Sequence, residues 1–176
     1  MTHRMRRLGV VVALGALLGV FGGMVTAGPA LARGPGWEIQ PAEPFTLPAD
    51  FCGFPIGFSW PVRNEYSKIL KAADGSMIFL ITGVDKVVAT NLSTGKTSSA
   101  NVSGPAKVTT FPDGSVTFSS KGLAGFVFSP ADAQRFGMPT VGVTAGAQTE
   151  TIDADGNVTS FSLQGDVVVD TCAALS

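Results

Sequence analysis

The residues that could carry out acid–base or nucleophilic chemistry are few in this chain, and one type is almost missing. The single histidine, His3, lies next to the N-terminus. Without a histidine in the folded part, neither a Ser-His-Asp triad nor a Cys-His pair can be assembled. Zinc sites, which rely on histidine and free cysteine, are disfavoured for the same reason. We therefore predict no catalytic residue, no metal ligand and no cofactor, and the balance lies against an enzyme.

Carboxylates offer the remaining route to catalysis. The glutamates available for it are Glu38, Glu43, Glu65 and Glu150. A glycosidase needs two carboxyl groups about 5–9 Å apart, but only Glu65, beside Tyr66, has a neighbour that could raise its pKa. Because most Asp and Glu side chains are exposed, solvated carboxylates are the simpler interpretation. A barrel enzyme of isomerase or cyclase type, working with Tyr66 and Glu65, stays open as an alternative.

Asp153, Asp155 and Asn157 place oxygen ligands at alternate positions before and after Gly156, as at the start of an EF-hand loop. The twelfth position of such a loop needs a bidentate glutamate, and here it is Gln164. A hairpin turn explains the same residues without a metal. We predict the turn.

Aromatic side chains are concentrated near the start of the folded part. The cluster consists of Trp37, Phe45, Phe51, Phe54, Phe58, Trp60 and Tyr66. These residues either fill the core or line an apolar cavity for a small ligand, as at the mouth of a β-barrel. In the second case the ligand-binding residues would be Phe58, Trp60, Arg63 and Tyr66.

The first 32 residues have the features of a secretory signal. Three arginines (Arg4, Arg6 and Arg7) precede an apolar run over residues 8–25, and Ala30-Leu31-Ala32 supplies a small-residue exit. We predict cleavage between Ala32 and Arg33 and release to the extracellular or cell-wall space of a bacterium. The choice between the Sec and twin-arginine routes stays open.

Cleavage would leave residues 33–176, one domain's worth of chain. Removing three of the 12 basic residues leaves nine against 13 acidic ones, a net charge of −4. Nothing resembles the basic stripe of a nucleic-acid-binding protein, and no later apolar run is long enough to span a membrane.

Cys52 and Cys172 are the only cysteines. In an exported protein they are predicted to form a disulfide, which would place the two ends of the domain side by side.

The spacing of turn residues predicts the fold. Residues 33–50, which hold four prolines, are expected to form an extended arm, followed by a single β domain over residues 51–176. Tight-turn pairs recur at Asp74-Gly75, Thr94-Gly95, Asp113-Gly114 and Asp155-Gly156. Turn candidates for the opposite end of the sheet are Gly83-Val84-Asp85, Ser103-Gly104-Pro105 and Lys121-Gly122. This rhythm is typical of an antiparallel meander.

Between the turns, apolar and polar residues alternate with period two, as in Phe54–Pro61, so each sheet should have one wet face. The one helical signal is short: Ser129 as cap and Pro130 at the first helical position. We predict an all-β, antiparallel up-and-down meander, a small barrel of eight to ten strands closed by one disulfide, with a two-sheet sandwich as the alternative.

Three segments carry a resemblance to known proteins: Cys52-Gly53-Phe54-Pro55, residues 90–96, and Asp170-Thr171-Cys172. The pattern resembles small exported actinobacterial proteins with terminal cysteines in CGFP and DxC motifs. This resemblance supports export and fold and implies no activity. By strand count alone the chain is also similar to lipocalin-like and allene-oxide-cyclase-like barrels, an analogy of fold only.

Three functions remain in competition. The first is a non-enzymatic exported barrel that binds a small apolar ligand or acts at the cell surface. The second is the barrel enzyme that would use Tyr66 and Glu65. The third is a structural or interaction module without a pocket. A cavity lined by Phe58, Trp60 and Tyr66 would separate the first two from the third.

Overall fold

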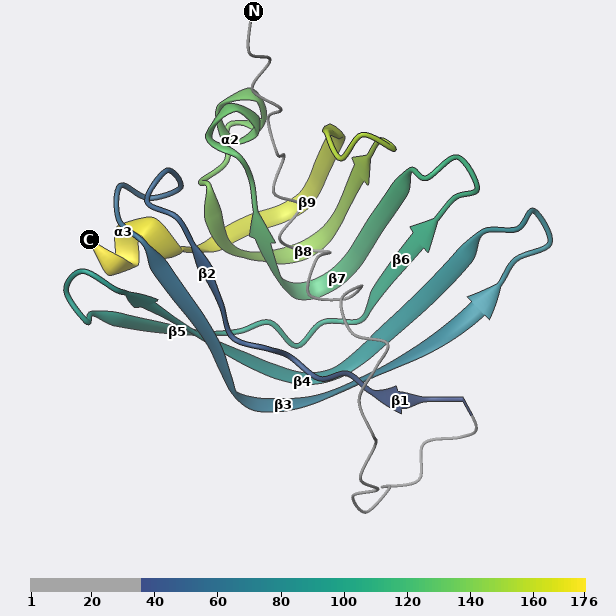
Figure 1. Cartoon of the computed structure of the whole chain (residues 1–176), viewed down its shortest axis with the longest axis horizontal. Helices are drawn as coiled ribbons and strands as arrows, with labels where there is room; N and C mark the ends of the chain where they lie inside the picture. Colours follow the sequence, from purple (N-terminus) through teal and green to yellow (C-terminus); the bar gives the residue numbers. More distant parts are fainter. Residues whose placement is uncertain (1–35) are drawn as a thin grey trace, which may run out of the picture.

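The structure, a computed structural model, describes residues 36–176, so the predicted signal segment and the first residues of the arm lie outside it. The described part forms one nine-stranded antiparallel sheet with two short helices (Figure 1). The elements are β1 (Glu38–Ile39), β2 (Phe45–Leu47), β3 (Ile56–Lys71), β4 (Met77–Asn91), β5 (Thr97–Asn101), β6 (Ala106–Thr110), β7 (Val116–Val127), α2 (Pro130–Phe136), β8 (Val141–Ile152), β9 (Val158–Asp170) and α3 (Thr171–Leu175). The strand order is β1-β3-β4-β6-β7-β8-β9, with β2 on β3 and β5 on β4. The predicted all-β antiparallel meander is confirmed.

The four tight-turn pairs all lie at hairpin turns, as predicted. They join β3 to β4, β4 to β5, β6 to β7 and β8 to β9. In the first, the glycine of Asp74-Gly75 has a positive φ of 90°, and the Asp74 side chain accepts a hydrogen bond from the Ser76 N–H at 2.9 Å. The Asx-Gly chemistry of the sequence therefore determined where the chain reverses.

The turns predicted for the opposite end were wrong. Gly83-Val84-Asp85 lies within β4 and Lys121-Gly122 within β7, while Ser103-Gly104-Pro105 separates β5 from β6 without reversing the chain. The long strands are therefore about twice as long as the turn rhythm predicted. Glycine in a sheet protein either allows the chain to turn or allows a continuous strand to bend. Gly83 and Gly122 lie inside continuous strands, so they serve the second purpose.

The bend is built by glycines that pair across strands. Gly122 in β7 lies opposite Gly146 in β8, which lies opposite Gly165 in β9. Gly146 and Gly165 have φ of 139° and 155°, and a Cβ on Gly146 would stand 2.3 Å from the carbonyl oxygen of Gln164. Only glycine fits such a close backbone approach at positive φ. This row of glycines lets β7, β8 and β9 curve together (Figure 1).

A fork divides the sheet beside the bend. β5 and β6 pair with the two halves of β4, and β7 pairs with β6 but with no part of β5. The fork begins at Gly104-Pro105, where Pro105 lacks an N–H for a ladder and the Gly104 backbone lies against the carbonyl of Leu123. Past this point β7 and β8 fold over the inner face of β3 and β4, where Val141 joins the core of Phe58 and Ala89.

The sheet curls but does not close as a hydrogen-bonded barrel. Among the described strands β9 pairs only with β8, and the strands at the other edge pair only with β3. The physical reason is that β9 ends in a helix: Asp170 accepts a hydrogen bond from the Ala173 N–H at 3.0 Å and so caps α3. α3 contacts β4, β5, β8 and β9, and Leu175 is fully buried in the core. A helix thus closes this end of the curl.

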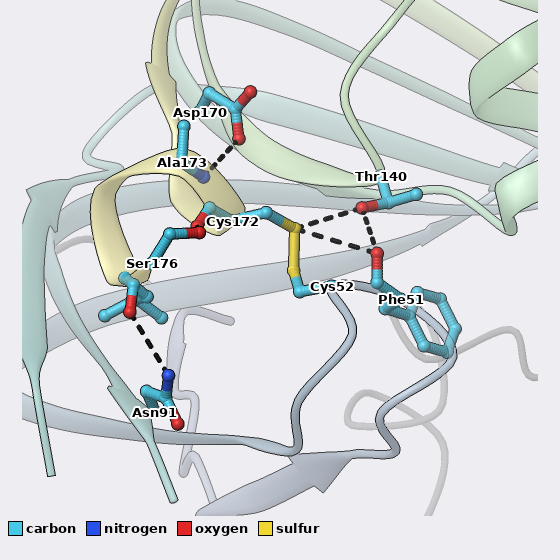
Figure 2. The surroundings of a disulfide bond; sticks show 9 residues. Phe51, Cys52, Asn91, Thr140, Asp170, Cys172, Ala173 and Ser176 are labelled. Atoms are coloured by element: carbon cyan, nitrogen blue, oxygen red, sulfur yellow. Dashed lines mark hydrogen bonds between the residues drawn. A yellow bond between two sulfur atoms is a disulfide. The ribbon is translucent and has the colours of Figure 1, made fainter. Parts of the chain in front are cut away.

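The predicted disulfide between Cys52 and Cys172 is confirmed. Its Cα atoms are 5.2 Å apart and it joins the loop before β3 to α3, across a sequence separation of 120 (Figure 2). The Thr140 hydroxyl donates to the Phe51 carbonyl at 2.6 Å, and the Asn91 amide donates to the carbonyl of Leu175. The beginning and the end of the domain therefore lie side by side, as expected.

Two smaller elements complete the fold. α2 begins as predicted, with the Ser129 hydroxyl accepting from the Asp132 N–H at 3.1 Å and Pro130 at the first helical position. The proline-rich arm contributes β1 and β2, which pair with β3. Neither α2 nor α3 is long and apolar enough to cross a membrane, and no other helix occurs within residues 36–176.

Candidate functional site

A cavity of about 240 Å³ lies inside the curl. β2, β3, β4 and β5 form one wall, and β7 and β8 form the other, on the far side of the fork. Most of the large side chains in the walls are apolar: Phe45, Phe58, Trp60, Ile81, Val87, Val102, Phe118, Phe126, Val127, Val141, Val143 and Val169. Because β7 pairs with β6 but not with β5, no hydrogen-bonded ladder closes the space between β5 and β7, and residues of both strands line the cavity.

A β-bulge at Trp60-Pro61 determines which residues of β3 face this cavity. Ser59 pairs with Val88 and Val62 with Lys86, so β3 holds one extra residue there. An extra residue shifts the inward-facing set from even to odd positions, and Pro61 suits a bulge because it cannot donate to the ladder. Phe58 and Trp60 before the bulge, and Arg63 and Glu65 after it, consequently share one face and line the cavity.

Three of the four residues predicted to bind a ligand are brought together. Phe58, Trp60 and Arg63 line the cavity, whereas Tyr66 does not. Beyond the bulge Tyr66 falls on the other face of β3, where its hydroxyl donates to the Asn64 side-chain oxygen at 3.3 Å. Glu65 and Tyr66, the pair of the enzyme alternative, therefore face opposite sides of the strand.

One end of the cavity carries charges. Arg63 Nη1 donates to Asp85 Oδ2 and Nη2 to Glu65 Oε2, both at 2.8 Å, and Nε donates to the carbonyl oxygen of Gln40 at 2.9 Å. The three charged side chains are exposed by only 17% (Arg63), 15% (Glu65) and 6% (Asp85). The Arg63 guanidinium also lies 5.8 Å from the centre of the Trp60 ring, so the ion pairs and the aromatic wall hold one another in place.

Burial raises the pKa of Glu65 and of Asp85 above their usual ranges. The positive charge of Arg63 opposes the effect at both carboxyl groups, and the negative charge of Asp85 adds to it at Glu65. The cluster holds two acidic groups and one basic group, so it carries an excess of negative charge when both carboxyl groups are ionised.

Two polar side-chain atoms of cavity residues lack a hydrogen bond within the described part of the chain. They are Asp85 Oδ1 and Ser120 Oγ; both atoms are buried, and both residues line the cavity. A buried polar atom left without a hydrogen bond costs about 1–3 kcal/mol. A bound molecule that reached these atoms would remove that cost.

Sequence reasoning missed Asp85 because it assigned that residue to a turn. A signal was present: Arg63 and Asp85 each lie eleven residues from Asp74, so extending the Asp74-Gly75 hairpin far enough places them opposite one another. Ser120 was missed as well, although extending the Asp113-Gly114 hairpin places it opposite Ala106.

The Asp153–Asn157 segment is the predicted hairpin turn. The Asp153 carboxylate accepts from the N–H groups of Asp155 and Asn157, at 3.0 and 2.8 Å. The Asn157 side-chain amide also donates to this carboxylate and, together with the Asn157 N–H, is the main reason that the pKa of Asp153 lies below its usual range. The carboxylate is thus engaged in stabilising the turn.

No protein-family model, curated protein or solved structure matches the chain. The resemblance to small exported actinobacterial proteins and to lipocalin-like barrels accordingly stays a prediction.

Proposed function

We propose that this protein is exported and binds a small apolar molecule in the cavity of the curled sheet. The cavity itself is the observation that carries the proposal. Well-packed domains leave few voids larger than a water molecule, whereas this space of about 240 Å³ has aromatic and aliphatic walls and a few polar groups at one end. That combination is typical of small-molecule sites.

The size of the cavity limits the ligand. A cavity of about 150 Å³ lined by apolar side chains binds one benzene. In proportion, the present cavity admits about ten non-hydrogen atoms. One aromatic ring with a short substituent fits this limit.

Two observations support export. The N-terminal order of arginines, apolar run and Ala30-Leu31-Ala32 is that of a cleaved signal, and disulfides such as Cys52–Cys172 persist in oxidising compartments. The enzyme alternative gains no support, because Glu65 and Tyr66 face opposite sides of β3.

Native mass spectrometry of the protein collected from a bacterial culture medium tests both parts of the proposal. We expect a mass beginning at Arg33, two hydrogens below the reduced value, with an additional small-molecule mass that organic extraction removes. The extracted protein should then bind toluene, as observed by ligand NMR.

A pair of variants on β5 controls this binding experiment. Ala100 lines the cavity and Ser99 is exposed on the other face of the strand. Ala100→Phe should fill the space and abolish toluene binding, while Ser99→Phe should leave it unchanged. Retention of residues 1–32 in the collected protein would contradict export. Absence of both cargo and toluene binding in the wild type would contradict the binding function.

A further inference from the structure

The polar end of the cavity carries information about the ligand beyond its apolar body. Two acidic side chains and one basic side chain meet there, and the basic one is already engaged. Arg63 donates to Asp85, to Glu65 and to the Gln40 carbonyl. The cavity therefore has no uncommitted cation among these three charged groups to attract an anionic head group.

Hydrogen-bond acceptor atoms at the cavity, in contrast, still have unused capacity. Asp85 accepts from Arg63 through Oδ2, and its carboxyl group also interacts with the backbone N–H of Lys86. Within residues 36–176, no hydrogen bond of normal geometry reaches its Oδ1. Ser120 Oγ likewise makes no hydrogen bond in the described part of the chain. An ionised carboxylate accepts hydrogen bonds but cannot donate them. The group that would satisfy Asp85 Oδ1 is therefore a donor.

The net charge of the cluster indicates which kind of donor group fits best. With Asp85 and Glu65 ionised and Arg63 protonated, the cluster carries one net negative charge in a largely buried setting. A buried charge is costly unless an opposite charge offsets it. A protonated amine would both donate to the free oxygen and neutralise the cluster, whereas a hydroxyl would only donate and a carboxylate would add repulsion.

We infer that the cavity takes a small apolar amine, with its ammonium group against Asp85 and Glu65 and its apolar body among the aromatic side chains. This inference rests on the proposed binding function and names the class of its ligand. The aromatic rings of Phe45 and Phe58, stacked 4.8 Å apart between centroids, form part of the apolar wall. Burial raises the pKa of both carboxyl groups, and an ammonium ion beside them would oppose that shift.

Three probes with the same apolar body test the inference: 2-phenylethylamine, 2-phenylethanol and phenylacetate. Their dissociation constants are measured by calorimetry at pH 7 on the exported protein after organic extraction. A charge-assisted hydrogen bond exceeds a neutral one by enough to give about tenfold in affinity. We expect the amine to bind about tenfold more tightly than the alcohol, and phenylacetate to bind most weakly.

Variants locate the effect at the cluster. Asp85→Asn keeps an acceptor for Arg63 but removes the charge, so it should weaken binding of the amine by about tenfold while changing binding of the alcohol little. Glu65→Gln is a second variant with the same expectation, should Asp85→Asn fail to fold. Asp113→Asn is the matched control, because Asp113 is exposed in the β6–β7 turn and does not line the cavity. It should change the binding of neither the amine nor the alcohol.

The outcomes separate this inference from the proposed function. If the alcohol or phenylacetate binds as tightly as the amine, the inference is wrong and the binding function stands. The inference is also overturned if Asp85→Asn and Glu65→Gln both leave the preference for the amine unchanged. If toluene and all three probes fail to bind, the proposed function falls as well.

Discussion

Glu150 is the residue at which a single titration has the clearest consequence for stability. It lies in β8 between Phe118 of β7 and Phe161 of β9 and is only 9% exposed. Burial raises its pKa to about 7, and the negative charge of Asp132 on α2 adds to the shift. The folded protein therefore holds a proton on Glu150 at pH values where the unfolded chain has released it.

The sign of the resulting pH dependence follows from linkage. Between the unfolded pKa of 4.5 and the folded value of about 7, unfolding releases a proton, so this carboxyl group makes the free energy of unfolding fall as pH rises. The loss amounts to roughly 3 kcal/mol at pH 8 and vanishes below pH 4. We expect Glu150→Gln to stabilise the protein at pH 8 and to have little effect at pH 4.

Denaturant unfolding of the wild type and of Glu150→Gln across this pH range measures the difference directly. Asp85 and Glu65 also have raised pKa values, but they are present in both proteins and cancel in the comparison. A difference in unfolding free energy that is independent of pH would contradict the assignment of the shift to Glu150.

At the scale of the elements, the row of glycines across β7, β8 and β9 decides the shape of the sheet. A side chain at Gly146 would meet the Gln164 carbonyl oxygen at 2.3 Å in a backbone conformation with φ of 139°. Strain at such a φ and overpacking each cost about 1–3 kcal/mol. We expect Gly146→Ala to lower the free energy of unfolding by about 2–6 kcal/mol, measured by urea denaturation.

Gly125, in the neighbouring strand β7, supplies the matched control. A Cβ there would make an ordinary contact with Val102 at 3.6 Å, and no positive φ is required. Gly125→Ala should therefore change the unfolding free energy by less than about 1 kcal/mol. Equal effects of the two substitutions would show that the close backbone approach is not what makes glycine necessary at Gly146.

The elements also show where local sequence reasoning succeeds. Asp-Gly and Thr-Gly pairs located the hairpin turns, and Ser129-Pro130 located the start of α2, because these signals act between residues close in sequence. The same reasoning misjudged Gly83 and Gly122, since a glycine that turns a chain and one that bends a strand look alike without their neighbours across the sheet.

For the whole molecule, the disulfide and α3 hold together the ends of a sheet that does not close by itself. Cys52 and Cys172 enclose nearly the entire folded domain. Removal of a native disulfide from a small secreted domain costs about 2–5 kcal/mol. We expect the Cys52→Ser/Cys172→Ser double variant to have a free energy of unfolding lower by about 2–5 kcal/mol. Its denaturant midpoint should therefore lie below that of the wild type.

Reduction provides the control for this prediction. Dithiothreitol should shift the unfolding midpoint of the wild type to that of the double variant and leave the double variant unchanged. An unaltered wild-type midpoint after complete reduction, verified by mass, would contradict a stabilising role of the disulfide.

The sequence by itself determined the all-β class, the hairpin turns, the disulfide pair, α2 and the shared face of Phe58 and Trp60. Each of these depends on alternation, on turn chemistry or on a count of two cysteines. The tertiary structure alone decided the rest. The bulge at Trp60-Pro61 placed Arg63 and Glu65 in the cavity and Tyr66 outside it. The length of the β3–β4 hairpin placed Asp85 opposite Arg63, and the fork at Gly104-Pro105 let β7, with Ser120, line the same space. Those outcomes depend on register and on packing between strands distant in sequence, and a shift of one residue reverses which face a side chain occupies.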